Sequence, residues 1–306
     1  MSEPLPVVVF AFNRPQKLRR ILEALRTQSI EQMVIFVDGP RHAVDLPLVE
    51  ASRLLARGVD WAPAELHLWE ENRGLNGFID NISLVLETYR WAIFVEDDCL
   101  PMPGYCQFMR QALERYLNFP EVFSIGGYQP LTKRAFKDYP HSLISSARFN
   151  CWGWATWRDR WQKLVPEVRS YAELFDGLQH VPEIAGTDLP WVARAMANGD
   201  MPESWDIKVA IACLNQRLVH LEATRGLVRN IGLDRSGIHG SFRGIFRDWI
   251  VHNWNVEKEM PSDLVWLNHV ESNKEYIQRL QTFVSESRNI SIRMMIRRGI
   301  DIIRGI

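Results

Sequence analysis

An alternation of strand-like runs and helical patterns over the first hundred residues constrains the fold of this chain most. The strand-like runs, mostly apolar, lie at residues 7–12, 33–37, 65–69 and 91–95. Apolar residues recur at helical spacing around residues 18–25, 49–55 and 79–89. Short apolar runs bounded by turns are typical of strands buried on both faces. The alternation therefore predicts an α/β fold, with a mainly parallel sheet between two layers of helices.

The fourth run ends in three adjacent acids, Glu96, Asp97 and Asp98. A buried strand does not tolerate three neighbouring carboxylates, so we expect the chain to reach an edge or a cleft there. Like charges repel unless a cation neutralises them, and carboxylate oxygens suit Mg²⁺ or Mn²⁺, which commonly share their coordination with phosphates. The triplet predicts a metal-dependent site for a phosphorylated ligand; the alternative is an acidic turn in solvent.

Polar residues also follow the other predicted strands. Asn13 and Arg14 follow the first strand, Asp38 the second, and a turn-rich connection at residues 72–77 the third. Ligands collect beyond the carboxyl ends of the strands in such sheets. We expect these residues and the acidic triplet to share one rim, and this convergence favours a ligand site over a solvated turn.

The second half of the chain is less regular. We expect a helix over residues 105–117, a strand over residues 122–125, and a further apolar helix over residues 207–218. Asp206 directly precedes that last helix and could simply cap it. Residues 230–242, rich in glycine and small polar residues, predict a loop that carries His239.

Four tryptophans crowd residues 148–161. Trp154, Trp157 and Trp161 are three and four residues apart, which predicts a helical stripe that packs inward. Trp152 and Gly153 precede this stripe and are expected to be the more exposed pair.

Composition excludes several classes of protein. The 306 residues carry a net charge of −1, so no overall field attracts nucleic acid. Four scattered cysteines without a Cys-x-x-Cys pair argue against structural zinc and favour a reducing compartment. We read no signal peptide and no membrane span, and expect a cytoplasmic protein. Residues 289–306 combine four arginines with one acid, which favours a basic amphipathic helix. This helix could contact the inner face of the cell membrane, or dock on the core or on a second subunit.

The order of these motifs resembles that of the GT-A glycosyltransferases. It is most similar to the inverting N-acetylglucosaminyltransferase of N-glycan processing and to bacterial family-2-like enzymes. The matching segments are VVVFAFNRP, VDG, FVEDDCLPMPGY, SIGGY, FNCWGWATWRDRW, SWD and RNIGLDRSGIHGSF. The resemblance implies a GT-A fold with a nucleotide-sugar-binding half at 1–100. An acceptor and catalytic-base half would follow at 101–245, and a helical extension at 246–306.

The resemblance also implies roles on the donor side. Asp98 would bind Mn²⁺ or Mg²⁺ directly, Asp97 would contact the donor ribose or metal-bound water, and Glu96 would contact the transferred sugar. Asp38 would hydrogen-bond the nucleotide base, and Arg14 would lie near the donor nucleotide.

On the acceptor side, Asp206 would be the catalytic base, and Trp152 and Gly153 would line the acceptor. His239 would belong to a loop that closes over the donor, with metal ligation as a weaker inference. The sequence departs from the family in two respects. Ile207 follows Asp206 where the family has a second acid, and no membrane anchor or stem is visible.

These expectations describe an inverting, metal-dependent hexosyl- or N-acetylhexosaminyltransferase of bacterial polysaccharide biosynthesis. Its donor would be a nucleotide diphosphate sugar, with UDP favoured, and its acceptor a glycan or a lipid-linked glycan. One alternative is a nucleotidyltransferase acting on sugar phosphates. That class needs a glycine-rich basic loop after the first strand, where this chain has only Asn13, Arg14 and Pro15. The other alternative is a non-catalytic nucleotide-sugar-binding module.

Overall fold

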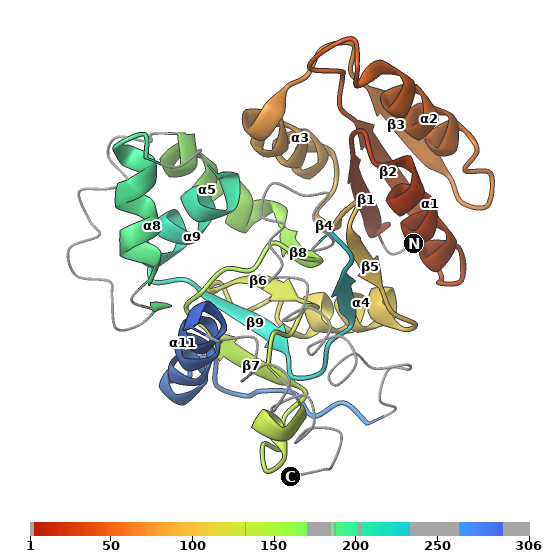
Figure 1. The fold of residues 1–306 in the computed structure, drawn as a ribbon. Helices are drawn as coiled ribbons and strands as arrows, with labels where there is room; N and C mark the ends of the chain where they lie inside the picture. The colour runs from red at the N-terminus through yellow and green to blue at the C-terminus, as the bar shows by residue number, and fades with distance from the viewer. Residues whose placement is uncertain are drawn as a thin grey trace.

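The computed structural model describes residues 3–131, 133–169, 185–186, 188–200, 204–232 and 263–289 (Figure 1). Its strands are β1 (Pro6–Ala11), β2 (Gln32–Val37), β3 (Ala64–Leu68), β4 (Trp91–Glu96), β5 (Cys99–Pro101), β6 (Val122–Gly126), β7 (Leu143–Ser146), β8 (Trp154–Trp157), β9 (Val219–Ala223) and β10 (Val228–Asn230). Its helices are α1 (Pro15–Arg26), α2 (Leu46–Arg57), α3 (Gly74–Thr88), α4 (Tyr105–Arg115), α5 (Arg158–Arg169), α8 (Asp188–Ala197), α9 (Trp205–Asn215) and α11 (Lys274–Asn289), with a short 3₁₀ helix at Lys133–Phe136.

Eight strands form the main sheet, in the order β3-β2-β1-β4-β8-β6-β9-β7. β1, β2, β3 and β4 are mutually parallel, and β6 pairs in parallel with β9. Only β8 and β7 run against their neighbours in this sheet. The expected α/β fold with a mainly parallel sheet is therefore confirmed.

The two faces of the sheet bury separate apolar layers. Along β1, Val7 and Val9 pack into one layer, whereas Val8 and Phe10 pack into the other, as the two-residue period of a strand requires. Helices α1, α2 and α4 cover the first face, and α3, α5, α8 and α9 cover the second (Figure 1). Because both faces are covered, β1 and β2 are apolar almost throughout.

Helix α3 begins earlier than the sequence indicates. Residues 72–77 were expected to be a turn, but Gly74 already starts the helix. The carboxylate of Asp38, at the end of β2, accepts hydrogen bonds from the backbone N–H groups of Arg73 and Gly74, at 2.9 and 3.3 Å. An acid that follows a different strand thus accepts hydrogen bonds from the first backbone N–H groups of α3. The glycines of residues 72–77 do not by themselves indicate that a helix begins there.

The helical stripe expected for three tryptophans is wrong. Trp154 and Trp157 lie on β8, opposite Phe94 and Trp91 of β4, and only Trp161 lies on a helix, α5. Three residues apart on a strand place side chains on opposite faces, so Trp154 and Trp157 enter different apolar layers. All three are buried, as expected.

The C-terminal region is described only in part. Helix α11 packs against β7 through a small apolar cluster that includes Ile144, Tyr276 and Ile277 (Figure 1). The predicted basic helix at residues 289–306 lies outside the described residues apart from Asn289. Within the described part of the chain, no helix is long and apolar enough to cross a membrane. The division into regions at residues 100 and 245 stays a prediction.

Candidate active site

Strand pairing brings Arg14 beside the acidic triplet. β1 and β4 are adjacent and parallel, with Phe10 opposite Glu96, so the residues that follow the two strands meet at one edge. The Arg14 guanidinium donates from Nη1 to Asp98 Oδ2 at 2.7 Å, and from Nη2 to Asp97 Oδ1. The Asp97 side chain is 2% exposed and that of Asp98 is 13% exposed. Arg14 therefore spans two carboxylates at the expected rim.

Burial and mutual repulsion shift the pKa values of these groups. Burial raises the pKa of Asp97 to about 6, although the charge of Arg14 opposes the shift. Burial, and then the charges of Asp98, Asp206 and Asp97, raise the pKa of Glu96 well above its ordinary value. Burial lowers the pKa of Arg14, but its two carboxylate partners outweigh that effect and raise it. The cluster thus holds more negative charge than its single arginine offsets.

Asp206 belongs to the same electrostatic environment. It lies in the first turn of α9, where its charge contributes to the raised pKa values of Glu96 and Cys151. The Ser204 hydroxyl donates to Asp206 Oδ1. Ser204 is the N-cap residue of α9, so Asp206 lies within the first turn of the helix and not at its N-cap. A carboxylate in a first turn is also favoured by the helix dipole.

Aromatic packing fixes the start of α9. The Trp205 ring stacks on Phe78 of α3 at 5.4 Å between centroids and lies tilted against Trp154 of β8 at 6.1 Å. This contact sets the neighbouring Asp206 relative to the sheet edge. The SWD motif therefore combines an anchor, Trp205, with a charged group beside it.

The Asp38 carboxylate accepts four hydrogen bonds at the end of β2. It accepts from Gly39 N and Arg73 N, each at 2.9 Å, from Asn72 Nδ2 at 2.9 Å and from Gly74 N at 3.3 Å. Burial raises its pKa, and these backbone bonds oppose that shift. Asp38 thus ties β2 to the start of α3, and its contact with a nucleotide base stays a prediction.

Gly232 belongs to the candidate site, although its sequence context did not predict it. β10 pairs with β5, directly after the triplet, and Ile231 N donates to the backbone oxygen of Asp98 at 2.7 Å. A Cβ added to Gly232 would lie 2.1 Å from Asp98 Oδ2, so only glycine fits here without movement. Gly232 lies in the glycine-rich segment at residues 230–242, but that composition does not indicate its contact with Asp98. His239, seven residues further on, lies outside the described residues.

The expected exposure of Gly153 is wrong. Gly153 is buried with a φ of +68°, and an added Cβ would lie 2.5 Å from Val228 Cγ2. Glycine is needed for packing and for this left-handed backbone conformation. Trp152 is half-buried and meets Tyr128 edge to face at 4.7 Å between centroids. An acceptor contact for Trp152 stays a prediction.

The acidic residues suit a divalent oxygen-seeking metal. Asp97 Oδ2 is buried and has no hydrogen-bond partner, which is the state expected of an oxygen that meets a ligand. Across the described residues, no three His, Cys, Asp or Glu side chains are arranged to hold a metal. Mg²⁺ and Mn²⁺ commonly complete their coordination with substrate phosphates and water, so one or two carboxylates are enough.

No protein-family model and no curated protein matches this sequence. A cytidylyltransferase from Leptospira borgpetersenii serovar Hardjo-bovis (strain JB197) is 10% identical with a TM-score of 0.33, over 64% of this chain and 74% of that chain. The mannosyltransferase PcManGT from Pyrobaculum calidifontis, in complex with GDP-Man and Mn²⁺, is 14% identical with a TM-score of 0.39, over 71% and 75%. The bifunctional glycosyltransferase WbbM, in its apo form, is 8% identical with a TM-score of 0.31, over 56% and 34%. At these values the activity has to be argued from the site itself.

Proposed function

We propose that this chain is an inverting, metal-dependent glycosyltransferase. It moves a sugar from a nucleotide diphosphate sugar to a hydroxyl of a glycan or a lipid-linked acceptor. The observation that carries the proposal is the convergence of four carboxylates at the carboxyl edge of a parallel sheet. Glu96 ends β4, Asp97 and Asp98 follow it, and the charge of Asp206, in the first turn of α9, acts on Glu96.

The two groups of acids support two different tasks. Asp98 is the proposed metal ligand, with Asp97 and Glu96 toward the ribose and the transferred sugar. A bound Mn²⁺ or Mg²⁺ would act as a Lewis acid on the donor diphosphate. Arg14 adds a guanidinium at the same place, where negative charge develops as the diphosphate leaves.

Asp206 is the proposed general base. It comes from a different element than the metal-side acids, and would face the anomeric carbon from the side opposite the diphosphate. It would take the proton of the acceptor hydroxyl as the oxygen bonds to the anomeric carbon and the diphosphate departs, which inverts that centre. Ser204 holds one oxygen of this carboxylate, which fixes its orientation.

A nucleotidyltransferase is supported less well by the connection after β1. Arg14 there binds two acids, and Pro15 starts α1 at once, which leaves no glycine-rich loop for a triphosphate. The two reactions differ in their product. Glycosyl transfer releases a nucleoside diphosphate, whereas nucleotidyl transfer releases pyrophosphate.

A thermal-shift screen of UDP-, GDP-, CDP- and dTDP-sugars, with and without Mn²⁺, tests the proposal. One donor class is expected to raise the melting temperature only with metal, because a ligand that binds the folded state stabilises it by mass action. That donor should then release nucleoside diphosphate slowly in water. Stabilisation without any turnover would indicate a binding module, and the absence of any stabilising nucleotide sugar would overturn the proposal.

A further inference from the structure

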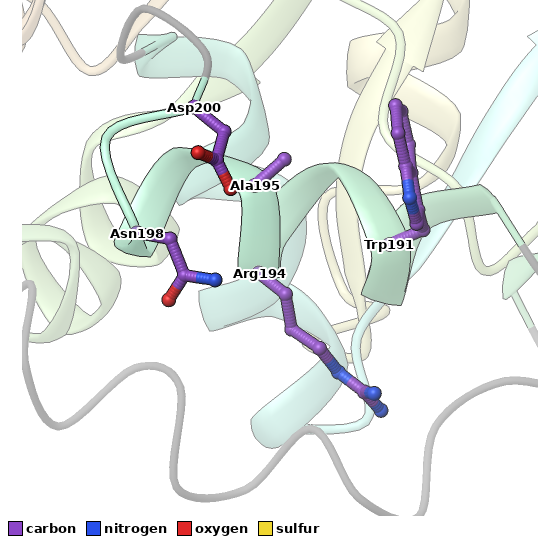
Figure 2. Close-up of a pocket in the computed structure, with 5 residues that line it drawn as sticks. All are labelled: Trp191, Arg194, Ala195, Asn198 and Asp200. Carbon is purple, nitrogen blue, oxygen red and sulfur yellow. The ribbon is translucent and has the colours of Figure 1, made fainter.

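Helix α8 presents a second candidate site, away from the acidic triplet. Its inward stripe, Leu189 and Ala193, packs into the apolar layer that α9 shares. The opposite stripe holds Trp191, Arg194, Ala195 and Asn198, spaced three and four residues apart as neighbours on one helical face. With Asp200 these residues line a hollow (Figure 2).

Trp191 is the one large aromatic side chain among the residues that line this hollow. The residue is 59% exposed, although the other described tryptophans are buried or half-buried. Among the described residues it makes no aromatic ring contact, so the core does not explain it. An exposed indole offers a flat apolar face beside an N–H donor, which suits a ligand with both C–H and hydroxyl groups.

The remaining lining residues complete such a surface. Ala195 lies one helical turn from both Trp191 and Asn198 along α8, and its side chain is small and buried. It therefore forms the floor of the hollow and leaves space there for a ligand. Arg194, Asn198 and Asp200 are exposed and supply N–H donors and carboxylate or amide acceptors around that floor. Because a cation and an anion are both present, the hollow favours neither an anionic nor a cationic ligand. Hydroxyl groups, which donate and accept, match it best.

The hollow lies on the chain segment that leads to the proposed base. Gly199, with a φ of +77°, ends α8, and Asp200 N closes the last turn on Ala195 O at 2.8 Å. Asp206 lies six positions after Asp200, so their Cα atoms are at most about 22 Å apart even along an extended chain. An acceptor of several sugars could therefore contact both places.

We propose that the α8 hollow binds a neutral sugar unit of the acceptor glycan, distal to the hydroxyl that reacts. This inference rests on the proposed function, since it names a second contact of the same acceptor. Trp191 stacks on the sugar ring, and Arg194, Asn198 and Asp200 bond its hydroxyls.

An oligosaccharide array probed with the labelled full chain tests the inference. Trp191→Leu keeps an apolar side chain but loses the flat ring, and should weaken glycan binding about tenfold, the upper range for an aromatic contact. Trp191→Phe should retain most of the binding. Leu54→Ala, which removes an apolar side chain 65% exposed on α2, is the matched control and should bind as the unmutated chain does.

Metal-dependent hydrolysis of a nucleotide sugar, without acceptor, separates this inference from the proposed function. Unchanged hydrolysis with selective loss of glycan binding in Trp191→Leu supports both. Two outcomes would overturn the α8 site while the proposed transferase activity is retained. One is a chain that hydrolyses a nucleotide sugar but binds no glycan, and the other is glycan binding that Trp191→Leu does not change. Trp191-dependent glycan binding in a chain that neither binds nor hydrolyses any nucleotide sugar keeps the glycan site and removes the transferase.

Discussion

Arg14 Nη1 lies 2.7 Å from Asp98 Oδ2, the carboxylate proposed to bind the metal. The same guanidinium also binds Asp97, so two carboxylates share the single positive charge of Arg14. A divalent cation and this guanidinium would compete for the same oxygens. Loading of a metal is therefore expected to require that Asp98 turn away from Arg14, which frees the guanidinium for the donor diphosphate.

Arg14→Met is expected to bind Mn²⁺ at least about tenfold more tightly in the absence of donor. Removal of a unit charge within 4 Å is worth several kcal/mol at the effective dielectric near a surface, and tenfold needs only about 1.4 kcal/mol. Electron paramagnetic resonance of free Mn²⁺ measures the affinity directly. Arg41→Met removes another guanidinium, paired with Asp45 at 2.9 Å, and is the control. Equal Mn²⁺ affinity in the two variants would contradict the competition.

Asp206→Asn is expected to slow transfer by about 10²–10⁴-fold, the usual contribution of a general base. The amide keeps the size of the side chain and can still accept from Ser204. Donor binding with metal should therefore remain close to that of the unmutated chain, as calorimetry can measure. Asp98→Asn should show the opposite pattern, with metal-dependent donor binding lost first. If Asp206→Asn loses donor affinity and rate together, the carboxylate belongs to the donor site.

Local sequence patterns were enough to predict the parallel half of the fold. The strands β1, β2 and β4 are buried on both faces, so their sequences are almost continuously apolar and can be recognised directly. The start of α3 and the strand β8 were not predictable, because long-range partners decide them. Asp38 supplies the cap for α3, and β4 and β6 hold Trp154 in a strand. Local propensity gives way to such contacts.

The candidate site was predictable where it follows the rule for strand ends. Arg14 and the triplet meet because β1 and β4 are parallel neighbours. The part played by Gly232 was not predictable, since the pairing of β10 with β5 joins residues about 130 positions apart. No local pattern indicates that a glycine must lie against Asp98.

Gly232→Ala is expected to weaken metal-dependent donor binding by about tenfold, while the melting temperature changes little. The new Cβ would lie 2.1 Å from Asp98 Oδ2 and 2.8 Å from its Cγ, so the Asp98 side chain must move. A displacement of this kind costs on the order of 1–3 kcal/mol. Calorimetry with Mn²⁺ and the donor measures the loss.

Gly126→Ala is the control for Gly232→Ala. Its added Cβ meets Glu222 Cγ at 3.6 Å, an ordinary contact, and donor binding should be unchanged. Normal donor binding in Gly232→Ala would show that the position of Asp98 does not govern the metal.

Glu222 of β9 accepts a hydrogen bond from the Tyr276 hydroxyl of α11, and this contact joins the C-terminal helix to the sheet. The Glu222 side chain is buried, and burial raises its pKa from an ordinary 4.5 to about 7, although the Tyr276 hydroxyl opposes the shift. The folded state therefore holds the Glu222 proton more tightly than the unfolded state does.

Stability is accordingly expected to fall as the pH rises from about 4.5 to about 7, because over this range the unfolded chain releases the Glu222 proton while the folded chain keeps it. For a shift of this size the loss is on the order of 3 kcal/mol. Glu222→Gln stays neutral and keeps an acceptor for Tyr276, so it should lack this loss. Urea unfolding of both proteins from pH 4.5 to 8 measures the difference, in which the other titrating groups cancel. Tyr276→Phe removes the opposing hydroxyl and should move the window to higher pH. If the free energy of unfolding changes with pH in the same way for Glu222→Gln and for the unmutated chain, the pKa of Glu222 is not raised in the folded state. The contact between Glu222 and Tyr276 would then make no contribution to the pH dependence of stability.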